Sequence, residues 1–247
     1  MSLEKFKIAH DKQNSLLYWF PKICNLDIPV PKTEWVLVKE DLLQYLGSEK
    51  EFPKELRNKL IASGRKIGYP LFLRTDILSG KHDWERTCYA QTENDLIGHV
   101  YTLIETSECA DILGLGINAF VFREFLQLDW KFKAFEGMPI ARERRYFIKN
   151  GKVLCHHPYW IEDAIAKGWH KYPLPNNWKD ILKELNKETK QEIKILTSYA
   201  MKVADIMDGF WSVDFAYSKS GKWYLIDMAR GEVSWHPNCK YAKEVES

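Results

Sequence analysis

The sequence has no run of about 20 apolar residues, the length that a helix needs to cross a bilayer. Its first segment, Met1 to His10, is charged and lacks the apolar stretch of a secretory signal. Internal repeats and low-complexity tracts are absent as well. These absences argue against a membrane partner, and we expect a cytoplasmic protein that remains where it is synthesised.

Cysteine is sparse, and its spacing suggests no pairing. The chain has five cysteines, an odd number, and none belongs to a C-x-x-C pair. We therefore expect neither a disulfide framework nor a zinc knuckle, and a reducing cytoplasm suits this usage. His156, His157 and His170 lack a suitably spaced cysteine or further histidine, so we interpret them as substrate-side or surface residues rather than zinc ligands.

An excess of charge of one sign is also missing. The 36 lysines and arginines nearly balance 34 aspartates and glutamates, and a net charge of +2 provides no global field to attract nucleic acid or an anionic membrane. Ten tryptophans would suit stacking on single-stranded bases. However, Trp211 and Trp223 lie in strand-like runs, where a buried aromatic is the ordinary expectation. The composition therefore allows nucleic acid as a partner but does not favour it.

What is present is an alternation of helical and strand-like patterns, in a chain long enough for one large domain or two packed lobes. The predicted helices cover 53–67, 94–108 and 178–208, the last being one long helix or two in tandem. The predicted strands cover 71–74 and 119–126, followed by hairpins with arms at 141–149 and 152–157 and at 210–217 and 222–228. A long loop rich in proline and tryptophan is predicted at 157–177.

The second hairpin carries two aspartates. With a two- or four-residue loop, Asp227 lies across from Ser212 and Asp214 lies across from Leu225. The two carboxylates are then diagonal neighbours on one face, with α-carbons about 7–8 Å apart. A three-residue loop would shift the register by one residue and separate them.

Two acids on a half-buried strand surface repel one another unless a proton, a base or a metal compensates. Mg²⁺ takes one or two carboxylates and leaves its other positions to water and phosphate oxygens. The pair therefore predicts a magnesium site at Asp214 and Asp227. The alternative is that both acids form ion pairs with nearby arginines such as Arg230.

Arg74 ends an apolar strand, an unusual place for a permanent cation unless it meets an anion. Ser79-Gly80-Lys81 follows in the next loop, and Arg74 with Lys81 is typical of a phosphate clamp. The loop is not a Walker P-loop, because the G-x-x-x-x-G-K-[ST] spacing is absent. A surface turn with a solvated lysine is the alternative.

The Asn150-Gly151 turn is the strongest short hairpin signal in the chain. It pairs Lys149 with Lys152, and counting from this pair puts Arg145 opposite His156. Arg145 would then face the same side as the histidine. An exposed ladder of charges around Arg145 is the alternative.

Several motifs follow one another in a recognisable order. They are Gly-Tyr-Pro-Leu-Phe-Leu-Arg74, the loop with Lys81, Phe-Arg-Glu124-Phe-Leu, Glu143-Arg-Arg145-Tyr-Phe, Asp214 and Asp227. In this order, over about residues 53–232, the chain resembles the ATP-grasp superfamily, and an arginine at position 74 resembles a compact bacterial and phage-associated branch of it. The resemblance implies an α+β, two-lobed fold with antiparallel sheets that sandwich ATP. Residues 1–52 would form a short amino-terminal region, 53–126 the first lobe and 127–247 the second lobe with the metal site.

The resemblance also implies site residues. Arg74 and Lys81 would contact phosphates, while Glu124, Phe125 and Leu126 would form the hinge that binds adenine. Asp129 would suit the ribose hydroxyls. The catalytic candidates are Arg145, which would meet the γ-phosphate or an acyl phosphate, and Arg230, and the metal candidates are Asp214 and Asp227.

Members of the superfamily typically phosphorylate a carboxylate and let an amine or thiol displace the phosphate. We therefore expect an ADP-forming carboxylate-amine ligase that uses ATP and Mg²⁺ and acts on a small molecule or a peptide. One alternative is a nucleic-acid end ligase, which the basic cluster at 142–145 would suit, although the K-x-D-G motif is absent. Another is a non-catalytic nucleotide-binding module, because Ala229 stands where the family commonly has a metal-binding asparagine. Glu232 is the candidate to supply a second metal site instead.

Overall fold

The computed structural model describes residues 12–47, 50–111 and 116–235, and the chain divides into two compact units. Unit 1 comprises Met1–Val30, Gln127–Ala134 and Pro139–Ser247, and unit 2 comprises Pro31–Leu126 and Phe135–Met138. The region expected at 1–52 is thus shared between the units, and its charged start, Met1 to His10, lies outside the described residues. Within the described ranges, no helix combines the length and apolar character that crossing a membrane requires.

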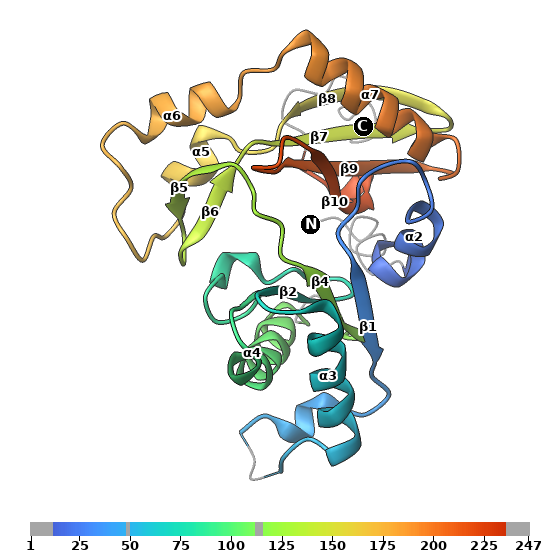
Figure 1. Ribbon diagram of the computed structural model, residues 1–247, viewed down its shortest axis with the longest axis vertical. Helices are drawn as coiled ribbons and strands as arrows, with labels where there is room; N and C mark the ends of the chain where they lie inside the picture. Colours follow the sequence, from blue (N-terminus) through green and yellow to red (C-terminus); the bar gives the residue numbers. More distant parts are fainter. Residues whose placement is uncertain (1–11, 48–49, 112–115, 236–247) are drawn as a thin grey trace. The chain divides into compact units, whose positions relative to one another are not determined.

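Unit 2 is built on a four-stranded antiparallel sheet with helices on one face (Figure 1). Its strand order is β1-β4-β2-β3, with β1 at Thr33–Leu37, β4 at Ala119–Glu124, β2 at Leu71–Thr75 and β3 at Tyr89–Ala90. Alternation along β2 and β4 sends Leu71, Leu73, Phe120 and Phe122 into one core with α3 (Lys54–Ile67) and α4 (Glu93–Asp111). Among the described residues of unit 2, no helix covers the other face of the sheet.

The ends of α3 follow from residues that favour them. Pro53 occupies the N-cap position, and Gly68 ends the helix with a φ of 89°, which an L side chain rarely adopts. The predicted helices at 53–67 and 94–108 are therefore confirmed. Two short 3-10 helices, η2 at Leu42–Tyr45 and η3 at Lys81–Asp83, complete unit 2.

Unit 1 contains a second antiparallel sheet, which α7 (Lys190–Ala204) covers on one face (Figure 1). The order is β10-β9-β7-β8, with β10 at Trp223–Arg230, β9 at Phe210–Tyr217, β7 at Glu143–Lys149 and β8 at Lys152–Pro158. The remaining elements are η1 at Lys12–Asn14, α2 at Leu16–Ile23, β5 at Trp130–Ala134, β6 at Met138–Ala141, α5 at Glu162–Ala166, α6 at Trp178–Leu185 and η4 at Gly231–Val233. The α7 side is apolar, since the Tyr199 ring lies 6.2 Å from that of Phe215.

The helical pattern over 178–208 proves to be two helices in tandem, one of the two forms expected. α7 begins at its own cap, because the Thr189 hydroxyl accepts a hydrogen bond from the Glu192 amide at 3.1 Å. The segment predicted as a loop at 157–177 contains α5, and β8 extends into it as far as Pro158.

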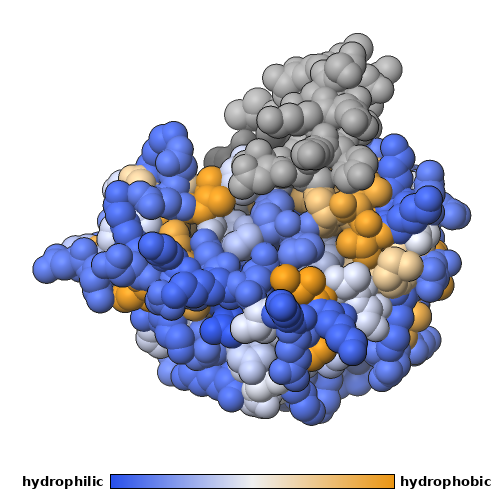
Figure 2. Space-filling model, turned by 90° about the horizontal axis from the view of Figure 1, so that it is seen from above, coloured by the Kyte–Doolittle hydropathy of each residue, from blue (hydrophilic) through white to orange (hydrophobic). Residues whose placement is uncertain are grey.

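Tryptophan is divided between the core and the surface. Trp211 is fully buried and Trp223 nearly so, which confirms the core role expected for both, whereas Trp169 is 67% exposed. The surface shown in Figure 2 is mostly hydrophilic, with its hydrophobic residues in separate groups.

The cysteine prediction is wrong at one residue. Cys155 of β8 is disulfide-bonded, whereas we expected no disulfide. All other cysteines are far from it in sequence, and a long-range bridge leaves no spacing pattern that could predict it. Cys24 and Cys88 are free thiols.

Candidate functional site

Four polar residues form a row across the face of the unit 1 sheet that is opposite to α7. β10 contributes Asp227, β9 Asp214, β7 Arg145 and β8 His157, and each is the register partner of the next. Side chains that pair directly on neighbouring strands have Cβ atoms about 4.5–5.5 Å apart. We call this row the polar strip. Arg144 precedes Arg145 on β7 and therefore belongs to the α7 face.

The two acids pair differently from the prediction. We expected Asp227 opposite Ser212 and diagonal to Asp214, whereas Asp227 is paired directly with Asp214. The cause is a β-bulge at Ile226, an extra residue that shifts the register of the rest of β10 by one. The two acids do share one face, so that part of the prediction is confirmed.

A second bulge changes which histidine faces Arg145. The hairpin turn pairs Lys149 with Lys152 as predicted, but the register of β7 and β8 shifts between Phe147 and Ile148. Arg145 consequently pairs with His157, and the prediction of His156 at this position is wrong. His156 lies on the α7 face.

Arg145 connects the members of the polar strip. Its Nε and Nη2 donate to the two carboxylate oxygens of Asp214, both at 2.7 Å, and its Nη1 donates to the Trp235 carbonyl at 3.3 Å. Burial by itself would lower the pKa of Arg145, but the charge and hydrogen bonds of Asp214 outweigh it and the pKa is raised. An arginine partner is therefore present for Asp214, and it is Arg145 rather than Arg230.

The carboxylates of Asp227 and Asp214 are the donors available to a divalent cation. Asp227 is half-buried, and its Oδ1 accepts from the Met228 amide at 3.1 Å. Asp214 is 5% exposed, and its oxygens keep lone pairs beyond those that Arg145 uses. No group of three or more His, Cys, Asp or Glu side chains in the described part of the chain is arranged to hold a metal. The donors thus fit one hard cation that completes its shell with water and phosphate, as Mg²⁺ does.

Arg230 lies on the opposite face of β10. It pairs with Trp211, and its guanidinium lies 5.8 Å from the centroid of that ring. Its Nη2 and Nη1 donate to Glu232 and Gln13, both at 2.9 Å. The structure therefore does not bring Arg230 or its partner Glu232 to the polar strip.

In unit 2, Arg74 is buried on the helix-free face of the sheet. Its Nε donates to the Thr75 carbonyl at 3.0 Å and its Nη2 to the Ile77 carbonyl at 3.3 Å. Lys81 begins η3 directly after Gly80, whose φ of 64° is left-handed. Arg74 thus holds the start of the loop from which Lys81 emerges.

Arg123 is a second arginine of this face that the sequence analysis missed. It pairs with Phe72, two residues before Arg74 on β2, so the two arginines share a face. Arg123 is 3% exposed, and its Nε donates to the Thr33 hydroxyl at 3.2 Å. The signal was available, because Arg123 interrupts an apolar strand just as Arg74 does.

Glu124, Phe125 and Leu126 follow at the end of β4, and all three are half-buried. The Lys32 amide donates to the Glu124 carboxylate at 3.2 Å, which fixes the start of the segment. The Phe125 ring lies 4.8 Å from that of Tyr89, so the segment has an aromatic wall. Asp129, the predicted ribose residue, belongs to unit 1 and forms an ion pair with Lys131 at 2.6 Å.

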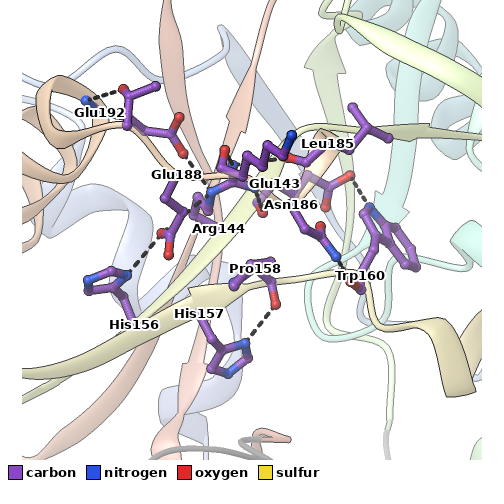
Figure 3. A network of polar contacts seen from close by, with 12 residues as sticks. Glu143, Arg144, His156, His157, Pro158, Trp160, Leu185, Asn186, Glu188 and Glu192 are labelled. Atoms are coloured by element: carbon purple, nitrogen blue, oxygen red, sulfur yellow. Dashed lines mark hydrogen bonds and ion pairs between the residues drawn. The ribbon is translucent and has the colours of Figure 1, made fainter. Parts of the chain in front are cut away.

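The α7 face of the unit 1 sheet carries a separate polar network (Figure 3). Arg144 Nε donates to Glu192 at 2.6 Å, and its Nη2 donates to the carbonyls of Leu185 and Lys187 at 3.0 and 2.9 Å. Burial lowers the pKa of Arg144 and raises that of Glu192. The network fixes the junction of α6 and α7 against the strand that carries Arg145.

Several solved structures share this fold. C-terminally truncated Cdc123 from Schizosaccharomyces pombe is 12% identical with a TM-score of 0.59, and the match covers 100% of this chain and 93% of that one. N5-carboxyaminoimidazole synthase from Aspergillus clavatus is 12% identical with a TM-score of 0.51, covering 98% and 49% of the two chains. D-alanyl-alanine synthetase A from Vibrio cholerae is 13% identical with a TM-score of 0.52, covering 97% and 61%. The chain therefore spans about half and three-fifths of the two synthetases, and such low identities show the fold alone.

The sequence itself identifies the family. No curated protein matches it, but the model for an ATP-grasp domain, the third family of its clade, matches residues 49–246. That range includes Arg74 and the whole polar strip. The expected α+β, two-lobed ATP-grasp fold is confirmed by this match and by the structural similarity. The chain belongs to this family of ATP-grasp domains.

Proposed function

We propose that the protein is an ADP-forming ligase that activates a carboxylate with ATP and transfers it to an amine, on a small-molecule or peptide substrate. The observation that carries the proposal is the polar strip, in which Asp227 and Asp214 are paired directly and Arg145 binds both oxygens of Asp214. Two acids and a fixed guanidinium on one helix-free face suit the handling of a charged phosphoryl group. Membership of an ATP-grasp family supports ATP as the source of that group.

Within this proposal Asp227 is the principal magnesium ligand and Asp214 its partner. Mg²⁺, when bound there with the nucleotide, would neutralise charge on the transferring phosphoryl group. Arg145 would orient the same group, because its remaining donor capacity lies beside the two carboxylates. The bond to Asp214 holds the guanidinium in place before the substrate arrives, which reduces the reorganisation that catalysis requires.

The nucleotide contacts proposed for unit 2 are those of its arginines and of the end of β4. Arg74 and Lys81 suit the phosphates, and Arg123 adds a second buried cation on the face of Arg74. The segment 124–126 suits adenine, which would pack near the Phe125 ring and bond to the chain at the end of β4. In unit 1, Asp129 would exchange Lys131 for the ribose hydroxyls.

Arg230 is not retained as a catalytic residue in the proposal. Its ion pair with Glu232 and its place beside Trp211 suit a structural role at the end of β10. For the same reason Glu232 is not retained as a second metal ligand, and the proposal needs one magnesium ion.

The test is product analysis. The purified chain is incubated with ATP, Mg²⁺ and a mixture of the twenty common amino acids, and nucleotides are separated by ion exchange. ADP and phosphate are expected, with an amide product by mass spectrometry, and Asp227→Asn should abolish all three while the exposed control Asp205→Asn retains them. AMP with pyrophosphate would instead indicate adenylation, as in end joining of nucleic acid.

A nucleotide-binding module without turnover is the second candidate. It is favoured by Ala229, which cannot bind metal, and by the engagement of both Asp214 oxygens with Arg145. This function predicts that calorimetry detects ATP binding while a phosphate-release assay stays at background with every acid and amine supplied. Steady release of phosphate that depends on Asp227 would contradict it.

A further inference from the structure

His157 completes the polar strip, yet the proposed function so far assigns it no role. It lies on β8 as the register partner of Arg145 and is 6% exposed. Figure 3 shows its ring pointing away from the cluster of Arg144 and Glu188. His157 therefore belongs to the face that carries Asp214 and not to the network that anchors α7.

One hydrogen bond fixes the state of the imidazole. The Nδ1 atom of His157 lies 2.7 Å from the Pro158 carbonyl oxygen, which accepts but cannot donate. Nδ1 must therefore carry the proton in the neutral ring. Nε2 then carries the lone pair and is the basic atom, held in a fixed orientation.

The surroundings suit an uncharged base. The Phe147 ring lies 5.9 Å from the imidazole and the Trp235 ring 5.8 Å, at 89° to it. Arg145, the cross-strand neighbour, opposes a second positive charge at this place. Phe147 is fully buried but Trp235 is 45% exposed, so a substrate would reach the imidazole by displacing the Trp235 ring.

We propose that His157 is the catalytic base for the amine substrate, with Nε2 accepting a proton from the incoming ammonium group. The inference rests on the proposed function, because it concerns the second half-reaction of a carboxylate-amine ligase. An ammonium group has no lone pair with which to attack, and a neutral imidazole next to the residue that orients the acyl phosphate can remove its proton there.

Proton removal and bond formation balance in the proposed step. Nε2 takes one proton from the ammonium nitrogen, whose freed electron pair forms a bond to the acyl carbon. The bond from that carbon to the bridging phosphate oxygen breaks, and the phosphate leaves with the electron pair. The second proton of the attacking nitrogen passes to the phosphate, and His157 later returns its proton to water.

The test compares two nucleophiles. A mixture of N-acetylated amino acids supplies carboxylates without free amines, and either methylamine or hydroxylamine is added with ATP and Mg²⁺. Hydroxylamine is largely unprotonated at neutral pH and needs no base to become nucleophilic, whereas methylamine is an ammonium ion. Hydroxamate, methylamide and ADP are measured for the wild type and for His157→Asn, in which the side-chain amide can still donate to the Pro158 carbonyl but the base is gone.

His157→Asn should form methylamide about 10²-fold more slowly than the wild type while hydroxamate formation stays within about threefold. An equal loss with both nucleophiles would show a structural role, and no loss with either would show no role; both results overturn the inference and leave the proposed function intact. A wild type that makes neither product nor ADP would contradict the proposed function itself, and the role of His157 with it. His157→Gln, which cannot place its amide at the position of Nδ1, separates folding from chemistry when its urea unfolding curve is compared with that of His157→Asn.

Discussion

The two faces of the unit 1 sheet use neighbouring arginines in opposite ways. Arg144 has no exposed surface and donates to Glu192 and to three backbone carbonyls, all on the α7 face. Arg145 lies on the other face, keeps 13% of its side chain exposed and holds Asp214. The two residues are adjacent in sequence and identical in chemistry, and only strand alternation separates them.

The contrast teaches how a sheet can serve the fold with one face and chemistry with the other. On the α7 face the charge of Arg144 is satisfied within the protein, by groups from α6, α7 and the chain between them. On the polar strip, carboxylates outnumber the arginine, and His157 adds a base. A surplus of negative charge beside a fixed guanidinium is an arrangement suited to a cation and a phosphate rather than to packing.

The comparison is broken most severely by Arg144→Met. The substitution leaves Glu192 buried without its charged partner, and breaking a buried ion pair in this way costs about 3–5 kcal/mol of unfolding free energy. Urea unfolding followed by circular dichroism measures the loss. The double variant Arg144→Met with Glu192→Leu, which removes both charges, should recover most of it. Equal stability of the single variant and the wild type would contradict the anchoring role.

On the other face, Arg145→Gln should act on turnover. Removal of one preorganised donor to a transition-state charge costs about 10²–10³-fold in kcat, so ADP formation should fall by that amount. Unfolding curves are measured beside the kinetics, so that loss of folded protein is not counted as loss of chemistry. A kcat within twofold of the wild type would remove Arg145 from the proposed mechanism.

The same variant sharpens the comparison through metal affinity. Arg145 neutralises part of the charge of Asp214, so Arg145→Gln should bind Mn²⁺ about tenfold more tightly than the wild type when no nucleotide is present. Calorimetry with Mn²⁺ alone provides the measurement. Lys131→Gln, which removes an exposed cation elsewhere in unit 1, is the matched control and should leave the affinity unchanged. Weaker binding by Arg145→Gln would show that the acids do not form the cation site.

The smallest expected effect concerns two glutamates of the α7 face. Burial would raise the pKa of Glu188, but the hydrogen bond and charge of His156, with Arg144, outweigh it and the pKa is lowered from 4.5. Stability from Glu188 is therefore present above pH 4.5 and is lost as the pH falls through the lowered pKa. Burial raises the pKa of Glu192 above 4.5, so its contribution has the opposite sign and is lost as the pH rises through the raised pKa.

Glu188→Gln and Glu192→Gln distinguish these contributions. The unfolding free energy of Glu188→Gln should depend less steeply on pH than that of the wild type below about pH 4.5. The free energy of Glu192→Gln should rise more steeply with pH above that value. Urea unfolding at half-unit pH intervals measures both slopes, and parallel curves for the two variants would refute the assignment.

Much of the fold could be read from periodicity and turn chemistry. The Asn150-Gly151 turn fixed the pairing of Lys149 with Lys152, since both turn residues adopt positive φ angles, 49° and 75°. Proline and glycine marked the ends of α3. The family could also be recognised, because the order of motifs around Arg74, Arg145 and the acid pair survives local irregularity.

The pairing within the site could not be read in the same way. Single-residue bulges in β10 and between β7 and β8 have no local sequence signal here, and each reverses the alternation beyond it. Counting from the turns therefore chose Ser212 for Asp227 and His156 for Arg145. Tertiary packing decides where such a bulge falls, since it must keep Met228 and Tyr146 buried on the α7 face while the strip residues face the other way.

Nucleotide binding by calorimetry tests the central claim, that the polar strip is the metal-dependent part of the ATP site. The non-hydrolysable analogue adenylyl imidodiphosphate is titrated into the wild type, Asp227→Asn and the control Asp205→Asn, with and without Mg²⁺. We predict that Mg²⁺ tightens binding at least tenfold for the wild type and Asp205→Asn but not for Asp227→Asn. An equal effect of Mg²⁺ on all three proteins would contradict the claim.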